Sequence, residues 1–475
     1  MRVVFLLIVL TASVAAFAQS GRVGPGDPSI PNPSAVGKAA DLSVKALFDE
    51  ANAYNKTKFA EFQEKKIPFS DNLLKQTQKE QKQLAAKYAA LVTTRPNLAG
   101  EDFYYLGLLH WIAENLDGTA ESMSKFLALE TRDPEKAQAA RSIVTVIDAK
   151  QNKLDAAEGM LAEYLRFEPQ KLKERSRMET EIAKAYQNGR NFEKMAAHAV
   201  EAFRSVKGMI VDAPSRAQVL DELLDAGMLV FEANRDAGNQ KQAEAALDDL
   251  RTLAARLGAP SLFYYAADKK IIYLIETGHK PEAMEFYLAA LVSAGRDLPI
   301  DTQRKDALMR LKKREKSYSM LGEPAPELKD IVTSFPGTVT SLSSLKGRVV
   351  LLDFWATWCG PCFEAFPSLT EWQEEFRKDG LTVIGLSRLE GLLAGEDVTP
   401  AEEIENFKKV RARQNLSYDL MVASEMTNHL SYNITALPTT ILIDRKGIVR
   451  YIDTGTSNLR LAELRAFMIK LLNEK

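Results

Sequence analysis

The chain changes character at Gly322, and this change constrains its fold more than any other feature. Over residues 39–319 apolar side chains return at helical spacing, with few prolines and almost no strand signal. Just beyond Gly322, Pro324 and Pro326 stop any helix, and short apolar runs typical of strands begin. The pattern predicts a multidomain protein with an N-terminal all-α region over residues 39–319 and a C-terminal α/β region over residues 321–475.

Length and charge agree with this division and narrow the partners. A chain of 475 residues exceeds what one hydrophobic core usually supports, so two or more domains are expected. The 62 basic residues are matched by 64 acidic ones. Because no basic excess exists, we expect no nucleic-acid partner, and the partners should be proteins or small molecules.

The first residues have the composition of an export signal. An early Arg2 precedes a continuous apolar stretch, and Ala16 and Ala18 form an Ala-x-Ala arrangement. We therefore expect a signal peptide over residues 1–18 and export to the periplasm. A retained membrane anchor is the alternative, although the apolar run is short beside the ~20 residues that span a bilayer. Residues 19–38 are rich in Gly, Pro and Ser and predict a flexible linker.

Similar segments recur along the helical region. Three of them begin at Leu116, Leu154 and Phe192, which lie 38 residues apart, and later units drift from this period. Each combines a small or polar opening, Ala at packing positions and large apolar residues, and so resembles a tetratricopeptide-like (TPR-like) array. Such helix pairs bury their faces by stacking into a solenoid, whose concave surface suits a protein or peptide ligand. An irregular helical scaffold without a ligand is the alternative.

The two cysteines carry the chemistry that the sequence predicts. They lie three positions apart in WATWCGPC, directly after the apolar run RVVLLDF, so a strand-to-helix junction is expected there. At a helix N-terminus, unpaired backbone amides and the macrodipole stabilise a thiolate, which makes Cys359 the expected exposed nucleophile. Cys362, one turn later, is the expected shielded, resolving thiol. Pro361 suits the first helical turn, where its missing amide hydrogen costs nothing.

Two other uses of a Cys-x-x-Cys pair fit less well. A zinc site needs further ligands, but no second pair of cysteines exists and His429 is the sole histidine beyond residue 321. A structural disulfide over so short a loop removes little entropy from the unfolded chain. Redox exchange is therefore favoured, and no metal is expected.

Beyond the cysteines, strands and helices alternate. The sequence predicts a buried strand in LTVIGLS, a helix in PAEEIENFKKVRARQ, a hairpin turning at Lys446 and Gly447, and a closing helix in LAELRAFMIKLLNEK. Together these elements predict a mixed sheet covered by helices. Residues 390–400 have strong turn composition and predict a flexible loop.

Several motifs carry a family resemblance. FWATWCGPC, ALPTT and ILIDRKGIVR resemble the thioredoxin superfamily, and LGEPAPELKD followed by SLKGRVVLLDFWATWC is similar to the TlpA/ResA-type branch of exported bacterial thioredoxins. The resemblance covers about residues 321–475. It implies a thioredoxin fold, thiol-disulfide oxidoreductase activity and no bound cofactor. It also implies a protein client with a dithiol or disulfide, and an upstream thiol donor associated with the membrane.

The resemblance also assigns roles to single residues. It makes Pro438 the cis-proline that faces the disulfide and helps to dock substrate backbone, preceded by an apolar Leu437 as in reducing thioredoxins. It makes Asp353 the buried acid that moves protons to and from the resolving thiol. Burial of a carboxyl at the end of a core strand should raise its pKa.

Other positions form the expected surround of the cysteines. Trp358 and Gly360 flank Cys359 in this surround. The chain departs from the family pattern at one place, because the glutamate expected three residues after the second cysteine is Ala365, with Glu364 one position earlier. On a helix, that shift rotates the carboxylate by about 100°.

These observations predict a periplasmic protein-disulfide reductase that acts by dithiol-disulfide exchange, with the helical repeats recruiting a protein partner. The alternative is a scaffold or binding protein whose thioredoxin domain is mainly a docking module. The intact cysteine pair and Asp353 favour the enzyme.

Overall fold

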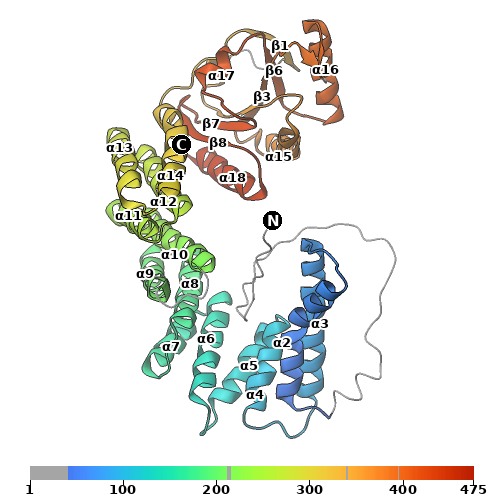
Figure 1. Ribbon diagram of the computed structural model, residues 1–475, viewed down its shortest axis with the longest axis vertical. Helices are drawn as coiled ribbons and strands as arrows, with labels where there is room; N and C mark the ends of the chain where they lie inside the picture. Colours follow the sequence, from blue (N-terminus) through green and yellow to red (C-terminus); the bar gives the residue numbers. More distant parts are fainter. Residues whose placement is uncertain (1–40, 211–215, 338–340, 394, 475) are drawn as a thin grey trace. The chain divides into compact units, whose positions relative to one another are not determined.

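A computed structural model describes residues 41–210, 216–337, 341–393 and 395–474. The expected signal peptide (1–18) and the whole of the expected linker (19–38) lie outside the described residues. Among the described residues, helices are the regular elements as far as Met320, and strands follow (Figure 1). Within the described part of the chain, no helix is both long and apolar enough to cross a bilayer.

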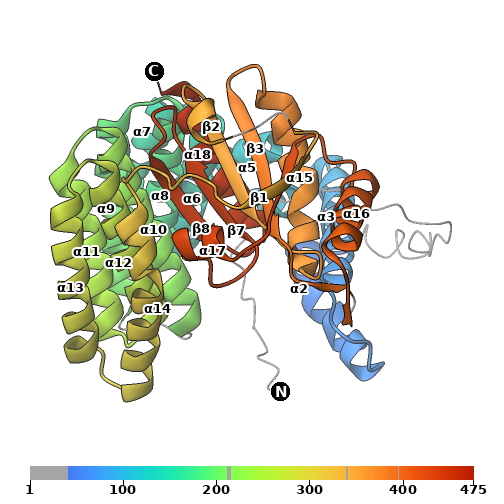
Figure 2. The ribbon, with the colours of Figure 1, turned by 90° about the horizontal axis from the view of Figure 1, so that it is seen from above.

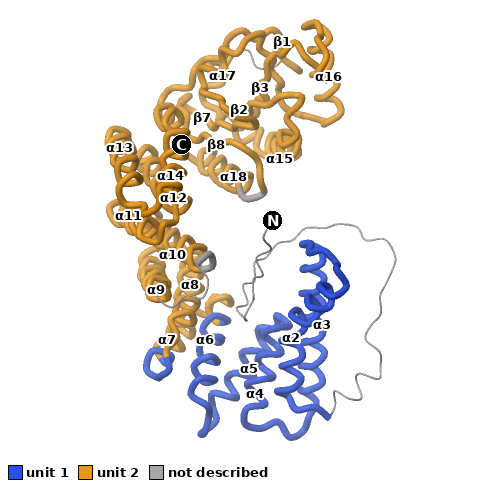
Figure 3. Tube along the Cα trace, in the orientation of Figure 1, with its two compact units in different colours: residues 1–147, 163–169 blue, residues 148–162, 170–475 orange. Residues whose placement is uncertain are grey.

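The chain divides into two compact units (Figure 3). Unit 1 comprises residues 1–147 and 163–169, and unit 2 comprises residues 148–162 and 170–475. The division falls within two helices of the repeat region, α6 and α7.

Unit 1 is a set of packed helices. Its core is formed by apolar side chains of its first three described helices, among them Leu47, Val92 and Leu109, none of which is exposed. Its helices are α2 (Val44–Glu64), α3 (Asp71–Thr93), α4 (Asp102–Ile112), α5 (Leu116–Leu127) and most of α6 (Pro134–Lys150), with the last turn of α7 (Leu154–Arg166).

The helical part of unit 2 has two layers, one with α9, α11 and α13 and one with α8, α10, α12 and α14 (Figure 2). Small residues let neighbouring helices approach closely: a Cβ on Gly227 would lie 3.1 Å from Leu250 and 3.3 Å from Phe203. The bounds are α8 (Leu172–Asn188), α9 (Phe192–Met209), α10 (Arg216–Asp236), α11 (Gln240–Arg256), α12 (Pro260–Glu276), α13 (Lys280–Asp297) and α14 (Asp301–Met320). This stacked, TPR-like arrangement confirms the predicted fold class of the N-terminal region.

A repeated turn explains the period seen in the sequence. The helices α5, α7, α9, α11 and α13 each start two residues after a residue with positive φ. The amide in between donates to the carbonyl five positions earlier, as in a Schellman turn. Five such residues are Glu114 (φ 59), Asn152 (φ 59), Arg190 (φ 56), Gly238 (φ 76) and Gly278 (φ 85).

The C-terminal part of unit 2 is a six-stranded mixed sheet in the order β1-β6-β3-β2-β7-β8. β2 and β3 are parallel, as are β3 and β6, whereas β1, β7 and β8 run antiparallel to their neighbours. The strands are β1 (Ile331–Phe335), β2 (Val349–Phe354), β3 (Leu381–Arg388), β6 (Asp419–Ala423), β7 (Thr439–Ile443) and β8 (Val449–Thr454).

Helices cover both faces of this sheet. α15 (Gly360–Phe376), α16 (Pro400–Arg413) and α18 (Asn458–Asn473) share one hydrophobic cluster with alternate strand residues. The short α17 (Thr427–Ser431) lies on the other face, where His429 contacts the ring of Phe354. The 3-10 turn η2 (Ser343–Leu345) precedes β2. The α/β thioredoxin fold predicted for this region is confirmed.

The segment 390–400, expected to be a flexible loop, contains a small hairpin in its described part. β4 (Leu392–Leu393) pairs antiparallel with β5 (Glu396–Asp397). Its base is fixed by Glu403 of α16, whose buried carboxylate accepts from the backbone amides of Glu390 (2.9 Å) and Gly391 (3.0 Å). Turn composition alone does not reveal this anchor, since Glu403 lies more than ten residues away.

The sheet and the last repeat helices are joined within unit 2. Arg314 of α14 donates to the carbonyl oxygen of Ile452 in β8 (2.9 Å) and pairs with Asp268 of α12 (3.1 Å). The same carboxylate oxygen of Asp268 accepts from the Tyr318 hydroxyl (2.6 Å). Backbone hydrogen bonds also join the segment between α14 and β1 to the β7–β8 hairpin. The amide of Gly322, for example, donates to the carbonyl oxygen of Val449 (2.8 Å).

Candidate active site

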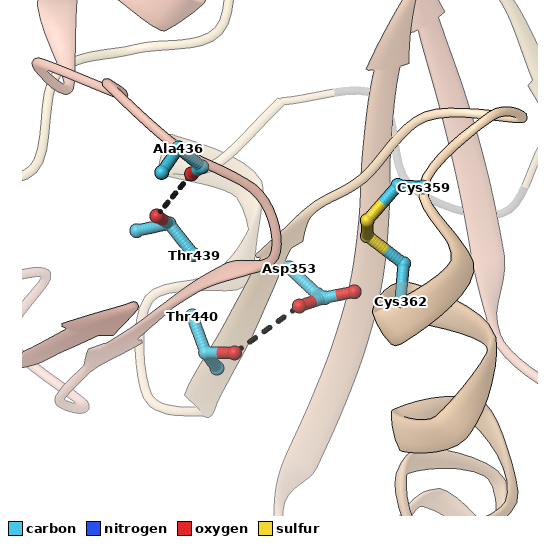
Figure 4. Close-up of a disulfide and its surroundings, with 6 residues drawn as sticks. All are labelled: Asp353, Cys359, Cys362, Ala436, Thr439 and Thr440. Carbon is cyan, nitrogen blue, oxygen red and sulfur yellow. Dashed lines mark hydrogen bonds between the residues drawn. A yellow bond between two sulfur atoms is a disulfide. The ribbon is translucent and has the colours of Figure 1, made fainter. Parts of the chain in front are cut away.

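The cysteine pair lies where β2 passes into α15. Cys359 is the N-cap residue of α15, and Cys362 lies in its first turn. Their sulfurs form a disulfide (Figure 4). Pro361 falls at the start of the helix, where no intrahelical bond needs its amide. The N-cap position directs the free amides of the first turn toward Cys359, which favours its thiolate once the disulfide is reduced.

Both cysteines are buried, which differs from the expectation for one of them. Cys362 is 0% exposed, as predicted for a shielded thiol, but Cys359 is only 3% exposed rather than open to solvent. In the disulfide form, Cys359 belongs to the same hydrophobic cluster as Cys362, so neighbouring side chains cover its sulfur. The two cysteines therefore differ mainly in their position on the helix and very little in their solvent exposure.

Asp353 lies next to the cysteine pair (Figure 4) and is the last residue but one of β2. It is 0% exposed. Its Oδ1 accepts from the Thr440 hydroxyl (3.1 Å), whereas its Oδ2 has no hydrogen-bond partner. Figure 4 shows the carboxylate between Thr440 and the disulfide, directed toward Cys362. Burial raises the pKa of the Asp353 carboxyl to about 7, and the Thr440 bond lowers it only in part.

The segment that enters β7 lies beside this group. The Leu437–Pro438 peptide bond is cis. The Thr439 hydroxyl donates to the carbonyl oxygen of Ala436 (2.7 Å), which ties the two sides of the proline together. Leu437 packs against the hydrophobic cluster that contains both cysteines. The structure therefore brings Asp353, the cysteines and the proline segment to one place.

Trp358 is the exposed part of the surround. Its side chain is 66% exposed although it precedes Cys359 directly. The indole Nε1 donates to Glu390 (2.6 Å), and the other carboxylate oxygen of Glu390 pairs with Arg388 (3.2 Å). The hairpin segment thus holds the indole next to the disulfide. Gly360 begins α15, and no side chain or backbone atom lies within 4 Å of the Cβ position it lacks.

At the position where the family pattern has a glutamate, this chain has no acidic side chain near the cysteines. Ala365 is buried, with its methyl group in the core cluster, and Glu364 is exposed. Across the residues the structure describes, no group of three or more His, Cys, Asp or Glu side chains is arranged to hold a metal ion.

Sequence reasoning missed three residues around the site, two in contact with it and one that acts through Glu390. Thr440 hydrogen-bonds Asp353, while Glu390 and Glu403 position Trp358. Thr440 had a detectable signal, because it follows the ALPTT proline by two positions and begins a strand that must pair beside β2. The two glutamates had none, since their partners depend on the tertiary packing of α16.

Known proteins resemble the C-terminal third of the chain. The family model described as Redoxin matches residues 320–466. The thioredoxin-like protein YneN of Bacillus subtilis (strain 168) is 33% identical over 138 residues, which are 28% of this chain and 72% of that protein. The thiol-disulfide oxidoreductase ResA of Geobacillus kaustophilus is 32% identical over 142 residues, covering 30% of this chain and 74% of ResA.

A solved structure also matches this region. The thiol:disulfide interchange protein from Bacteroides sp. is 25% identical and covers 32% of this chain and 91% of its own, with a TM-score of 0.27.

A strand-to-helix disulfide above a buried carboxyl, in a thioredoxin fold, defines the class of a thiol-disulfide oxidoreductase. The sequence relatives agree with this class. The chain belongs to the family of thioredoxin-like thiol-disulfide oxidoreductases, in its TlpA/ResA-type branch, and it carries a helical region before the catalytic fold.

Proposed function

We propose that the protein is an exported protein-disulfide reductase in which Cys359 and Cys362 have unequal roles. The Cys359 thiolate attacks a client disulfide, and the Cys359–client mixed disulfide forms as one client thiolate leaves. Cys362 then attacks Cys359, which releases the second client thiolate and closes the protein disulfide. A membrane-associated thiol donor restores the dithiol. The observation that carries this proposal is the position of Asp353, whose free oxygen points to Cys362.

Pro438 and Leu437 have the supporting role in this proposal. The cis-proline segment offers backbone groups to the client chain beside the sulfurs. Trp358, exposed and held by Glu390, offers an aromatic face at the same edge.

Insulin reduction by the full chain, with dithiothreitol as donor, tests the enzymatic proposal. We expect catalysed precipitation by the wild type and by Glu364→Gln, whose side chain is exposed on the same helix. Cys359→Ser should abolish catalysis, because it removes the nucleophile. Equal rates for the wild type and Cys359→Ser would refute the proposal.

The helical region over residues 39–319 recruits the client in this proposal, and the catalytic fold spans residues 321–475. A pocket of ≈ 670 Å³ between α11, α12 and α13 supports the recruiting role. Its walls carry charges of both signs beside an aromatic ring, from Lys241, Glu282 and Phe286. A peptide with mixed charge would fit such walls.

Capture of mixed disulfides tests this recruiting role. The Cys362→Ser chain should trap clients on Cys359, and they can be identified by mass spectrometry. We expect the charge reversals Lys241→Glu and Glu282→Lys to reduce this capture, with insulin reduction unchanged in the same reversals on the wild-type chain. Undiminished capture would remove the pocket's proposed role. Export is tested separately by cell fractionation, with periplasmic recovery expected and cytoplasmic retention contradicting it.

A further inference from the structure

A row of polar side chains crosses the sheet at the level of Asp353. In the strand register, Asp353 of β2 pairs with Thr440 of β7, and Thr440 pairs with Asp453 of β8. Directly opposed residues of antiparallel strands point to the same face of the sheet. The bond from the Thr440 hydroxyl to Oδ1 of Asp353 confirms this for the first pair.

Thr440 also lines a small cavity, whose walls do not include Asp353. Its space of ≈ 10 Å³ is about what one water molecule requires. The walls include Ala365, Pro438, Thr440, Asp453 and Arg460. Asp453 and Arg460 form an ion pair (2.9 Å) in which both side chains are partly exposed, so this end of the cavity borders solvent.

On its other sides, Asp353 has no neighbouring hydroxyl or cavity among the described residues through which a proton could reach solvent. On the β3 side its register partner is Gly385, which has no side chain, and the space there is closed by Leu420, Trp355 and Tyr418. The Tyr418 hydroxyl is buried without a hydrogen-bond partner. Burial, and then the charge of Asp353, raise the pKa of Tyr418 well above its ordinary value, so it stays neutral. Cys362 lies toward the remaining oxygen of Asp353 (Figure 4).

We propose that Thr440 is the proton-relay residue that connects Asp353 with solvent through this cavity. The inference rests on the proposed role of Asp353 toward Cys362, and it deepens that role by adding the exit path. Hydroxyl groups suit such a relay because they donate and accept at the same atom.

The relay acts when Cys362 must lose its proton while Asp353 is already protonated on Oδ1. In that state the bond reverses: Oδ1 donates to Oγ1 of Thr440, and the Thr440 hydroxyl turns to donate to the cavity water. The Oδ1 proton passes to Oγ1 of Thr440, whose own hydroxyl proton passes to a water in the cavity. Oδ2 takes the thiol proton of Cys362 at the same time. The Cys362 sulfur then attacks Cys359, the bond from Cys359 to the client breaks, and the client sulfur leaves as a thiolate. The carboxyl ends neutral, as it began, and one proton has reached solvent.

The test follows resolution of the mixed disulfide in the full chain by rapid mixing of the reduced protein with oxidised glutathione. Thr440→Val keeps the shape of the side chain and removes the hydroxyl, whereas Thr440→Ser keeps the hydroxyl. Ala365→Val narrows the cavity and leaves the Thr440 bond intact. The pKa of Asp353 in each variant is measured from its carboxyl infrared band, with Asp353→Asn as the blank.

At pH 6, after correction for the measured pKa, we expect resolution by Thr440→Val and Ala365→Val to be slower than wild type on the order of tenfold. Thr440→Ser should resolve at close to the wild-type rate, and at pH 8.5 all rates should converge, because the carboxylate then accepts the proton directly. The inference is overturned if the corrected Thr440→Val profile superimposes on that of the wild type, because Thr440 would then only set the pKa. A wild type without exchange activity would refute the proposed function before any variant is compared.

Discussion

Asp353 is a carboxyl group that folding buries completely, and its cost depends on pH. The folded chain holds the proton up to pH about 7, whereas the unfolded chain releases it near its ordinary pKa of 3.8. As the pH rises from about 4 to about 7, the carboxyl therefore destabilises the fold progressively, and the full cost persists above this range.

Asp353→Asn should remove this cost. Since each pKa unit corresponds to about 1.4 kcal/mol, we expect the oxidised variant to gain roughly 2–4 kcal/mol of unfolding free energy at pH 8 and almost nothing at pH 4. Urea unfolding followed by tryptophan fluorescence at both pH values measures this difference. An equal gain at both pH values, or a loss at pH 8, would show that folding does not raise the pKa of Asp353.

The burial of Asp353 was predictable at this scale, because LLDFW surrounds it with core-forming residues. The exposure of Cys359 was predicted wrongly. Helix position can be read from the order of a strand, a Cys-x-x-Cys motif and a proline. The solvent exposure of the sulfur cannot be read from the sequence, because it depends on side chains that tertiary packing brings over it.

At the scale of single elements, β3 contains a glycine, Gly385, at a position where neighbouring side chains leave no room for a larger residue. A Cβ on Gly385 would lie 2.6 Å from Leu420 and 3.1 Å from Nε1 of Trp355. The neighbouring strand therefore approaches Asp353 without a side chain between them.

Gly385→Ala should force these neighbours apart. We expect a loss of roughly 1–3 kcal/mol of unfolding free energy, because overpacking displaces Trp355, which packs on α15 and α16. Gly159→Ala is the matched control, since no atom lies within 4 Å of its added Cβ and the helix should gain stability. Thermal unfolding of both variants measures the effect, and equal midpoints would contradict the packing argument.

Most elements were predicted from the sequence, but two strands of the sheet were not. The helix after the cysteines and the hairpin at Lys446 and Gly447 follow from clear periodicity and turn residues. β1 and β6 were missed, since their short apolar runs gain strand character only in the sheet, where β6 pairs with both β1 and β3. Their neighbours in the sheet are distant in sequence.

At the scale of the whole molecule, the catalytic fold is tied to the end of the helical array by Arg314. Its bonds to Asp268 and to the backbone of Ile452 are largely shielded from solvent. Leaving a shielded charge without its partner costs more unfolding free energy than leaving an exposed charge unpaired.

Arg314→Gln should weaken this connection. We expect a loss of roughly 2–3 kcal/mol, because the Asp268 carboxylate loses its ion pair and, within the described residues, keeps the hydrogen bond from the Tyr318 hydroxyl. Arg310→Gln removes an exposed ion pair with Asp306 and should cost less than about 1 kcal/mol. Hydrogen exchange should quicken in β8 and α14 for Arg314→Gln alone. Unchanged exchange there would show that the two parts are not coupled through Arg314.

The unequal roles of the two cysteines are tested most directly by the reactivity of each thiol alone. Full chains carrying Cys362→Ser or Cys359→Ser are reduced, and the rate of reaction with a chromogenic disulfide is measured from pH 4 to 10. We expect Cys359 to react rapidly, with a midpoint below the ~8.5 of an ordinary thiol, because it lies at the N-terminus of α15. Cys362, buried beside Asp353, should react slowly and only at higher pH. Equal profiles, or a faster Cys362, would contradict the proposed mechanism.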